Sequence, residues 1–153
     1  MRSLADGLHA IALTLWVGGM WAIGGIVAPT LFHALGDRAL AGAVAGRLFT
    51  YLAWIGFGCA AYILLFRLVR FGGAAFKQAA FWLVIVMLLL AVAGEFGVQP
   101  ILSGLKAQAL PKEVMESIFR DRFSTWHGVA SVLYVVECAL GVLLVWVQGR
   151  NPR

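Results

Sequence analysis

Long apolar stretches dominate the sequence. Four of them contain neither lysine nor arginine: residues 4–35, 48–66, 79–101 and 129–147. Each is close to or longer than the roughly 18 to 20 residues that cross a bilayer as a helix. Because lipid offers the backbone no hydrogen-bond partner, a segment that crosses it must be helical. The pattern predicts four transmembrane helices, over about residues 5–30, 47–67, 79–102 and 124–147.

These helices would occupy nearly all of the 153 residues, so residues 1–153 are predicted to form a single domain, an all-α membrane protein. Short connections favour an antiparallel four-helix transmembrane bundle. An even number of helices places both chain ends on the same side of the membrane. Residues 32–46 are rich in alanine and glycine, and we expect a tight turn there.

The longest connection covers residues 103–123. Apolar residues recur in it between charged ones, and Pro111 stands at a suitable helix start. The apolar positions are Leu110, Val114, Ile118 and Phe119. This spacing predicts a short amphipathic interfacial helix, lying on the membrane surface between the third and fourth transmembrane helices.

Composition supports the membrane assignment. Hydrophobic residues make up 62% of the chain and charged residues only 12%, whereas soluble domains carry about 25% charged residues. The lipid bilayer is therefore the predicted partner of most of the surface. The net charge of +5 fits basic residues that flank the helices and face anionic headgroups, and it indicates no nucleic-acid partner. Basic residues are equally divided between the two sides of the membrane, but residues 67–77 carry only basic charges whereas the opposite side also carries acidic ones. This difference favours a cytoplasmic location for both termini.

Small residues recur four positions apart within the predicted helices. The pairs are Gly18 with Ala22, Gly24 with Ala28, Gly42 with Gly46 and Gly56 with Ala60. In lipid, small side chains let helix backbones approach closely. We interpret these pairs as close packing inside the bundle. The alternatives are self-association through the small-residue faces and packing against a larger membrane complex.

Ionisable residues inside a bilayer are costly, so each is a candidate functional residue. Glu95 and Gln99 are four apart and share a helix face, while His127 and His33 are expected at a similar depth. A carboxylate beside imidazoles suits a metal ion or proton exchange. The predicted metal ligands are therefore His127, Glu95 and His33. The alternative is a plain hydrogen bond between Glu95 and His127.

Two further groups of polar residues lie on the first and last predicted helices. His9 and Trp16 are seven apart and share a helix face, which makes them candidate cofactor-binding residues. One stripe of the last helix is predicted to face the bundle interior: His127, Ser131, Tyr134 and Cys138. Glu137 is a further intramembrane polar residue that lies off this stripe.

Signatures of enzymatic chemistry are absent from the sequence. It contains no phosphate-binding glycine loop, paired-histidine zinc helix, serine elbow or cysteine cluster. Cys59 and Cys138 fall inside predicted helices, where they are expected to be small buried side chains. These observations favour a protein that is not an enzyme.

Several separated motifs follow one another along the chain. They are His9, Trp16-Val17-Gly18-Gly19, Ala28-Pro29-Thr30-Leu31-Phe32, Ala41-Gly42 through Leu48-Phe49, Pro100, Arg122-Phe123 and His127-Gly128. In this order they resemble the bacterial members of the transmembrane protein 205-like family, which carries a domain of unknown function. The histidine followed by Trp-x-Gly-Gly is also distantly similar to copper resistance protein D. The resemblance implies a multi-pass protein of the bacterial inner membrane.

Three functional hypotheses follow. The first is a non-enzymatic accessory subunit, or a small transport or metal-handling factor. The second, which the resemblance to copper resistance protein D makes more plausible, is a haem- or copper-binding membrane redox protein with His9 or His127 as a ligand. The third is quinone or lipid binding between helices near Trp16, His9 and Glu137.

Overall fold

The structure consists of helices joined by short connections. The computed structural model describes residues 4–108 and 116–150, and no strand occurs in these two ranges. Three short segments differ from the α-helix: η1 and η3 are π-helical and η2 is a 3₁₀ helix. In chain order the elements are α1 (Leu4–Ala22), η1 (Ile23–Val27), α2 (Ala28–Ala34), α3 (Arg38–Phe71), η2 (Gly72–Lys77), α4 (Ala79–Val92), η3 (Ala93–Val98), α5 (Gln99–Gln108) and α6 (Glu116–Arg150).

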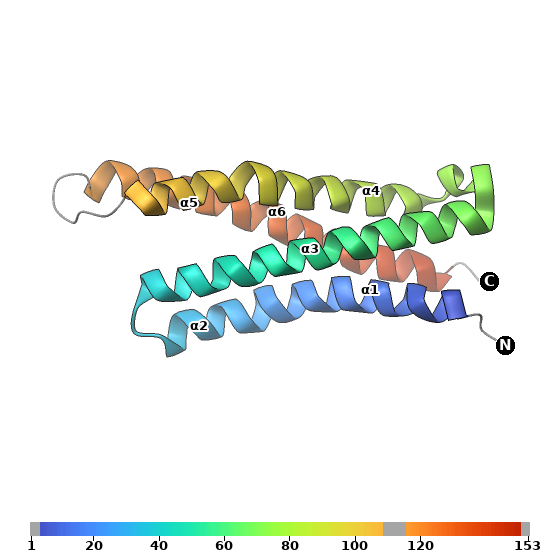
Figure 1. Ribbon diagram of the computed structural model, residues 1–153, viewed down its shortest axis with the longest axis horizontal. Coiled ribbons are helices and arrows are strands. Elements are labelled where there is room, and N and C mark those ends of the chain that lie inside the picture. The colour runs from blue at the N-terminus through green and yellow to red at the C-terminus, as the bar shows by residue number, and fades with distance from the viewer. Residues whose placement is uncertain (1–3, 109–115, 151–153) are drawn as a thin grey trace.

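These elements form four long rods (Figure 1). In the first rod α1 continues through η1 into α2, and in the third α4 continues through η3 into α5. Among the described residues, four stretches are long and apolar enough to cross a membrane: Leu4–Ala34, Leu40–Lys77, Ala79–Leu105 and Asp121–Arg150. The prediction of an all-helical protein with four helices of membrane-spanning length is therefore confirmed.

Successive rods run in opposite directions along the long axis of the molecule (Figure 1). Both chain ends lie at one end of the bundle, which we call the terminal end, and the opposite end is called the loop end. Helix α3 packs against α1 and α4, and α6 packs against α4 and α1. Each helix therefore has two neighbours, and the four enclose a common interior.

The first connection is shorter than the sequence predicts. Helix α2 continues to Ala34 and α3 begins at Arg38, so the turn expected over residues 32–46 is confined to residues 35–37. Asp37 starts α3 because its Oδ1 atom accepts a hydrogen bond from the backbone N–H of Leu40 at 3.3 Å, as a helix N-cap does. Most of the alanines and glycines that suggested a turn lie in helix α3 instead.

The second connection, at the terminal end, depends on one glycine. Gly72 follows the last residue of α3 and has a φ of +53°, a left-handed conformation that costs glycine little and commonly ends helices. The chain then passes through η2 and enters α4 at Ala79. This connection keeps α3 and α4 side by side.

The interfacial helix predicted over residues 103–123 is not confirmed. Helix α5 extends to Gln108 and α6 begins at Glu116, so the described parts of this segment belong to the long helices. Residues 109–115, which hold Leu110, Pro111 and Val114, lie outside the described residues. The helices extend beyond the apolar stretches because a helix needs no apolar side chains to continue outside the hydrocarbon region.

Each of the two π-helical segments ends shortly before a proline. Val27 ends η1 two residues before Pro29, and Val98 ends η3 two residues before Pro100. Proline lacks an N–H and clashes with the carbonyl four residues earlier, and the wider π turn accommodates that clash without ending the helix. The hydroxyl of Thr30 donates to the Ile26 carbonyl at 2.7 Å and helps to satisfy the backbone of η1.

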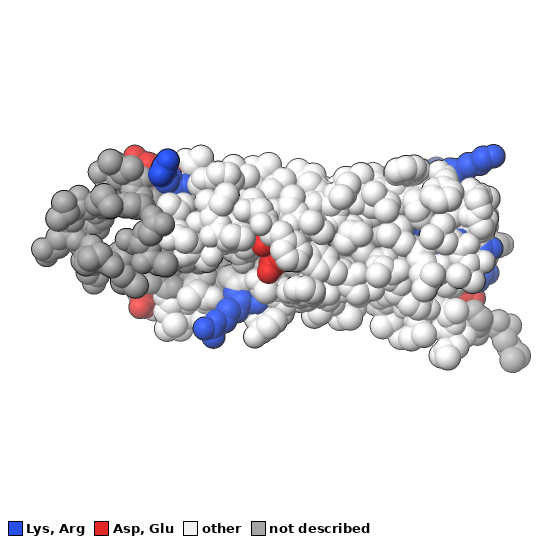
Figure 2. Space-filling view, turned by 45° about the horizontal axis from the view of Figure 1, so that its top comes forward, with Lys and Arg blue, Asp and Glu red and all other residues white. Residues whose placement is uncertain are grey.

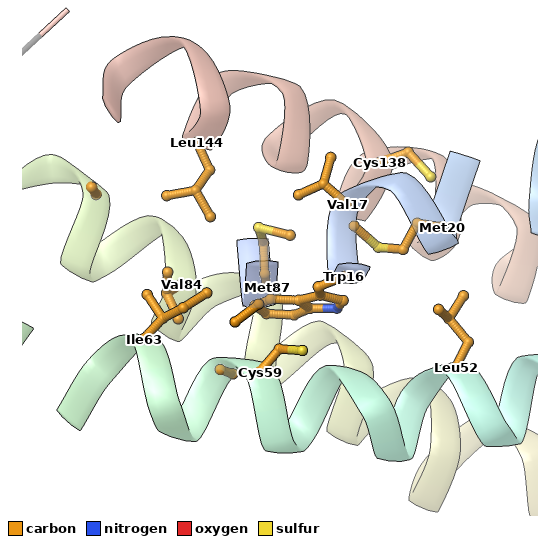
Figure 3. Close-up of a cluster of buried hydrophobic side chains, with 13 residues drawn as sticks. Trp16, Val17, Met20, Leu52, Cys59, Ile63, Val84, Met87, Cys138 and Leu144 are labelled. Atoms are coloured by element: carbon orange, nitrogen blue, oxygen red, sulfur yellow. The ribbon is translucent and has the colours of Figure 1, made fainter. Parts of the chain in front are cut away.

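The core is centred on Trp16, whose side chain is 1% exposed. Figure 3 shows its indole ring in the middle of the buried cluster, among side chains of α3, α4 and α6. The ring packs so closely on α3 that a Cβ atom added at Gly56 would lie 2.6 Å from Trp16 Nε1. The other largest fully buried side chains are Met20, Ile63, Met87, Leu144 and Val84.

The small-residue pairs fall on different sides of the bundle. Gly56 and Ala60 are both buried, so this pair packs within the bundle as we expected. Gly18 and Ala22 are exposed on the outside of α1. Spacing alone therefore does not decide which pair meets a helix of the same chain.

The outer surface is apolar along most of its length. Large hydrophobic side chains are exposed on all four rods, among them Ile11, Trp54, Leu89 and Val132. On the face shown in Figure 2 the charged side chains lie mainly toward the two ends of the molecule, with few between them. A surface of this kind is suited to lipid contact and would be unusually apolar for a soluble protein.

We predict that Gly56→Ala destabilises the fold, because the added methyl group would collide with the fully buried Trp16 ring. Overpacking of this kind costs about 1 to 3 kcal/mol. The free energy of unfolding is measured by titration with a denaturing detergent, followed by circular dichroism. Gly58→Ala is the matched control, since nothing lies within 4 Å of its added Cβ atom. Equal stabilities of the two variants would contradict the close approach of α1 and α3.

Candidate functional site

Polar side chains inside the bundle form three groups at different heights. The first group joins α1 and α6. The Tyr134 hydroxyl donates a hydrogen bond of 2.5 Å to the backbone carbonyl of Met20, three residues before η1 begins. Gly24 permits this approach, because a Cβ atom there would lie 2.2 Å from the Tyr134 ring. Tyr134 thus ties α6 to the irregular part of the first rod.

Two further intramembrane residues are buried next to Tyr134 on α6. Glu137 and Cys138 are each 8% exposed, and the Glu137 carboxylate is close enough to act electrostatically on Cys138 and Tyr134. Along the stripe predicted to face the interior, Cys138 is therefore buried and Tyr134 is half-buried. Glu137, which the sequence placed off this stripe, is buried as well.

The second group joins α3 to the third rod around Glu95. The hydroxyl of Thr50 donates to Glu95 Oε2 at 3.2 Å, and the amide of Gln99 donates to the Gly46 carbonyl at 3.3 Å. Glu95 belongs to η3, so the π turn presents this carboxylate to α3. Glu95 and Gln99 share a face as predicted, but their partners are on α3.

The histidines expected beside Glu95 face outward. His127 is exposed, and its ring stacks on Phe123 of the same helix at 5.9 Å with an interplanar angle of 8°. Ser131 is exposed as well, and its hydroxyl donates to the His127 carbonyl at 2.8 Å. The predicted hydrogen bond between Glu95 and His127 is therefore replaced by the bond from Thr50. Helical spacing defines which residues of α6 share a face, but it does not determine which part of that face contacts a neighbouring helix.

His33 is also exposed, near the end of α2. Within residues 4–108 and 116–150, no group of three or more histidine, cysteine, aspartate or glutamate side chains is arranged so that it could hold a metal ion. The described structure thus does not bring His127, Glu95 and His33 together as a set of metal ligands.

The third group lies at the terminal end and centres on Arg67. This arginine is 7% exposed, and its Nη1 atom donates a hydrogen bond to Gln78 Oε1 at the start of α4. The sequence interpretation treated Arg67 only as a flanking charge. A signal was present, because Arg67 follows buried Ile63 by four residues and Ala60 by seven, the spacing of one helix face.

His9 lies beside this arginine. Its ring packs against Phe66 with a centroid distance of 4.6 Å, and the charge of Arg67 is close enough to act on it. His9 is half-buried, while Trp16, its predicted companion on the same helix face, is fully buried in the core. Three buried nitrogen atoms in this region have no hydrogen-bond partner: His9 Nε2, Arg67 Nε and Gln148 Nε2.

The rim of this group ties the start of α1 to the end of α3. Arg70 Nη1 lies 2.6 Å from Asp6 Oδ1, and the Tyr62 hydroxyl donates to the Ala5 carbonyl at 3.2 Å. The Arg70 guanidinium also lies over the Phe66 ring, 5.7 Å from its centroid. The terminal end therefore holds the densest collection of charged and buried polar groups that the described residues show.

The helices and the apolar surface define a multi-pass helical membrane protein. Residues 11–111 match the family model described as Domain of unknown function (DUF4149), and this match covers well over half of the chain, so the chain belongs to that family. Comparisons with curated proteins and with solved structures gave no match. The matched region includes Trp16, Arg67 and Glu95, whereas His9 and His127 lie outside it.

We predict that Thr50→Val lowers stability, because it removes the hydroxyl that donates to Glu95 and leaves this carboxylate without that partner. Hydrogen bonds between membrane helices contribute about 0.6 kcal/mol on average and up to about 1.7. Thr30→Val is the control, since Thr30 is exposed and bonds only within its own rod. Unfolding titrations in mixed micelles should show a loss for Thr50→Val alone, and a similar loss for both variants would contradict the interhelix role.

Proposed function

We propose that this protein is a non-enzymatic accessory subunit of a bacterial inner-membrane complex, which binds a partner through an aromatic patch halfway along the bundle. The patch consists of Trp54 and Phe57 of α3 and Phe96 of η3. The observation that carries this proposal is the position of Trp54. It lies sixteen residues after the start of α3 and seventeen before its end, and 58% of its surface is exposed.

The three aromatic rings support one another. Trp54 contacts Phe57 at 5.5 Å and Phe96 at 6.3 Å, both edge to face, and Phe57 stacks on Phe96 at 6.0 Å. Such pairs hold large side chains in a defined shape. Phe96 is 59% exposed, so the patch presents a shaped apolar surface at the height of the bilayer centre.

Tryptophan at this height is unusual for a residue that faces lipid alone. Indole rings favour the membrane interface, where the N–H can be hydrogen-bonded. The bilayer core supplies no acceptor, and no acceptor for the Trp54 indole occurs among the described residues. A protein partner supplies both packing and an acceptor, which is why we favour a docking surface.

Small residues beside the patch support the approach of another helix. Gly58 and Ala61 follow Trp54 by four and seven residues on the same face of α3, and both are exposed. A Cβ atom at Gly58 would meet nothing within 4 Å. Small residues of this kind allow close contact between helices in lipid.

Charge at the terminal end supports the proposed orientation, with both termini in the cytoplasm. The described basic residues there are Arg67, Arg70, Lys77 and Arg150, and the acidic residue among them is Asp6. The sequence places equal numbers of basic residues at the two ends, so the orientation rests on the connection over residues 67–77, which is basic and contains no acidic residue. Our proposal also includes the family relationship that the sequence motifs suggest, to the transmembrane protein 205-like family and, distantly, to copper resistance protein D.

Photo-crosslinking in intact membranes tests the proposed docking surface. A benzophenone amino acid placed at Gly58 should give a discrete protein adduct whose yield falls several-fold when Trp54→Leu and Phe96→Leu are added. The same probe at Val132 is the control, because Val132 is 64% exposed near the middle of α6. An adduct with a different polypeptide supports the accessory role. Lipid adducts alone at both positions would contradict it, and an adduct of twice the chain mass would replace it with self-association.

Absorption spectroscopy of the purified protein tests the haem- or copper-binding alternative. A stoichiometric haem or copper signal that disappears in His9→Ala or His127→Ala would replace the accessory-subunit proposal with a redox protein. The buried, unpartnered Nε2 atom of His9 is the observation that favours this alternative.

A further inference from the structure

The terminal end carries a groove on its outer side, between α1 and α3. The groove has a volume of about 410 Å³ and is lined by Ala5, Tyr62, Leu65, Phe66, Val69 and Arg70. Five of these side chains are apolar or aromatic, and one is a cation at the groove's edge. An elongated ligand with an apolar tail and an anionic head matches this lining.

Charges around the groove do not balance. Arg70 forms an ion pair with Asp6 at 2.6 Å, whereas Arg67 donates to the neutral amide of Gln78. Asp6 thus offsets one of two arginines, and this corner of the molecule retains about one positive charge. Because Arg67 is 7% exposed, its charge is poorly screened by solvent, and a singly charged anion would neutralise it.

Unused hydrogen-bond donors point to the same conclusion. Arg70 lines the groove and has five N–H donors, and its ion pair with Asp6 engages only its Nη1 atom. Arg67 follows Phe66 in α3 but does not line the groove, because its side chain is buried on another face of the helix and donates to Gln78. Guanidinium groups are well suited to phosphate, which accepts several hydrogen bonds at once.

The height of the groove fits the headgroup region of a bilayer. Arg67 and Arg70 lie about twelve and fifteen residues beyond the midpoint of α3, or about 18 to 23 Å at 1.5 Å per residue. With the bilayer centred on the bundle, the hydrocarbon core ends about 15 Å from the midpoint and the headgroups about 20 to 22 Å from it. Leu65 and Tyr62 lie on the hydrocarbon side of the arginines.

We propose that this groove is a binding site for an anionic phospholipid. The phosphate binds at Arg70, beside Val69, and one acyl chain extends from there along Leu65 and Tyr62 toward the hydrocarbon core. The site is separate from the aromatic patch and does not depend on the accessory role proposed above. Basic pockets between helices on the cytoplasmic side of a membrane recognise anionic headgroups in this way.

Lipid titration of the delipidated protein in a neutral detergent tests this proposal. Phosphatidylglycerol should raise the melting temperature clearly more than phosphatidylcholine with the same acyl chains, because a ligand that binds the folded state stabilises it. Native mass spectrometry should show the same preference as retained lipid. Arg70→Gln should weaken phosphatidylglycerol binding about fivefold, the factor that corresponds to about 1 kcal/mol per basic residue near an anionic surface.

Two further variants separate lipid binding from a purely structural role of Arg70. Asp6→Asn also breaks the ion pair, but it adds one positive charge to the corner and should strengthen phosphatidylglycerol binding by a similar factor. Val69→Trp should fill the groove and abolish retention without changing any charge, and Val69 is 79% exposed, so this variant is expected to fold. Lys77→Gln and Val145→Trp are the matched controls for charge and for size, both at exposed positions near the same end.

The contradicting results are equally specific. Equal effects of the two lipids, or weaker phosphatidylglycerol binding in Asp6→Asn, would overturn the proposal. A melting-temperature rise with inorganic phosphate that equals the rise with phosphatidylglycerol would show that the site takes a free anion and would overturn the lipid assignment. Retention unchanged in Val69→Trp would show that the groove does not hold the lipid.

Discussion

The close approach of α1 to α3 is the contact on which the rest of the bundle depends. Trp16 is the largest side chain in the interior, and it fits because Gly56 has no side chain where the indole ring passes. Without a hydrophobic driving force between helices in lipid, such close van der Waals contact supplies much of the attraction. The surrounding residues of α4 and α6, such as Met87 and Leu144, then fill the remaining space at 0% exposure.

Irregular helix geometry accompanies the polar contacts in the loop-end half of the bundle. The two π segments precede Pro29 and Pro100 and make room for them. Glu95, which accepts a hydrogen bond from Thr50, lies within η3, and Met20, whose carbonyl accepts one from Tyr134, lies three residues before η1. The same local widening that keeps each helix continuous therefore lies at or near its side-chain bonds to other helices.

The polar groups differ in how well they are hydrogen-bonded according to their position along the long axis of the bundle. The middle is tightly packed, and its side chains Thr50, Gln99 and Tyr134 bond to neighbouring helices. The terminal end instead combines Arg67, His9 and Gln148 with unused hydrogen-bonding capacity. Burial of such groups is costly unless a partner satisfies them. On these grounds we propose a lipid ligand at the terminal end and a protein partner at the aromatic patch around Trp54.

The sequence by itself determined the class of protein and the number of helices, because a bilayer requires helices of a certain length and apolarity, and both are properties of consecutive residues. It also showed that Glu95 with Gln99, and His9 with Trp16, share helix faces. Only the tertiary structure decided which faces turn inward. Arg67 and Glu137 are buried while His127 is exposed, because spacing along one helix defines a face but the packing of its neighbours determines whether that face meets protein or lipid.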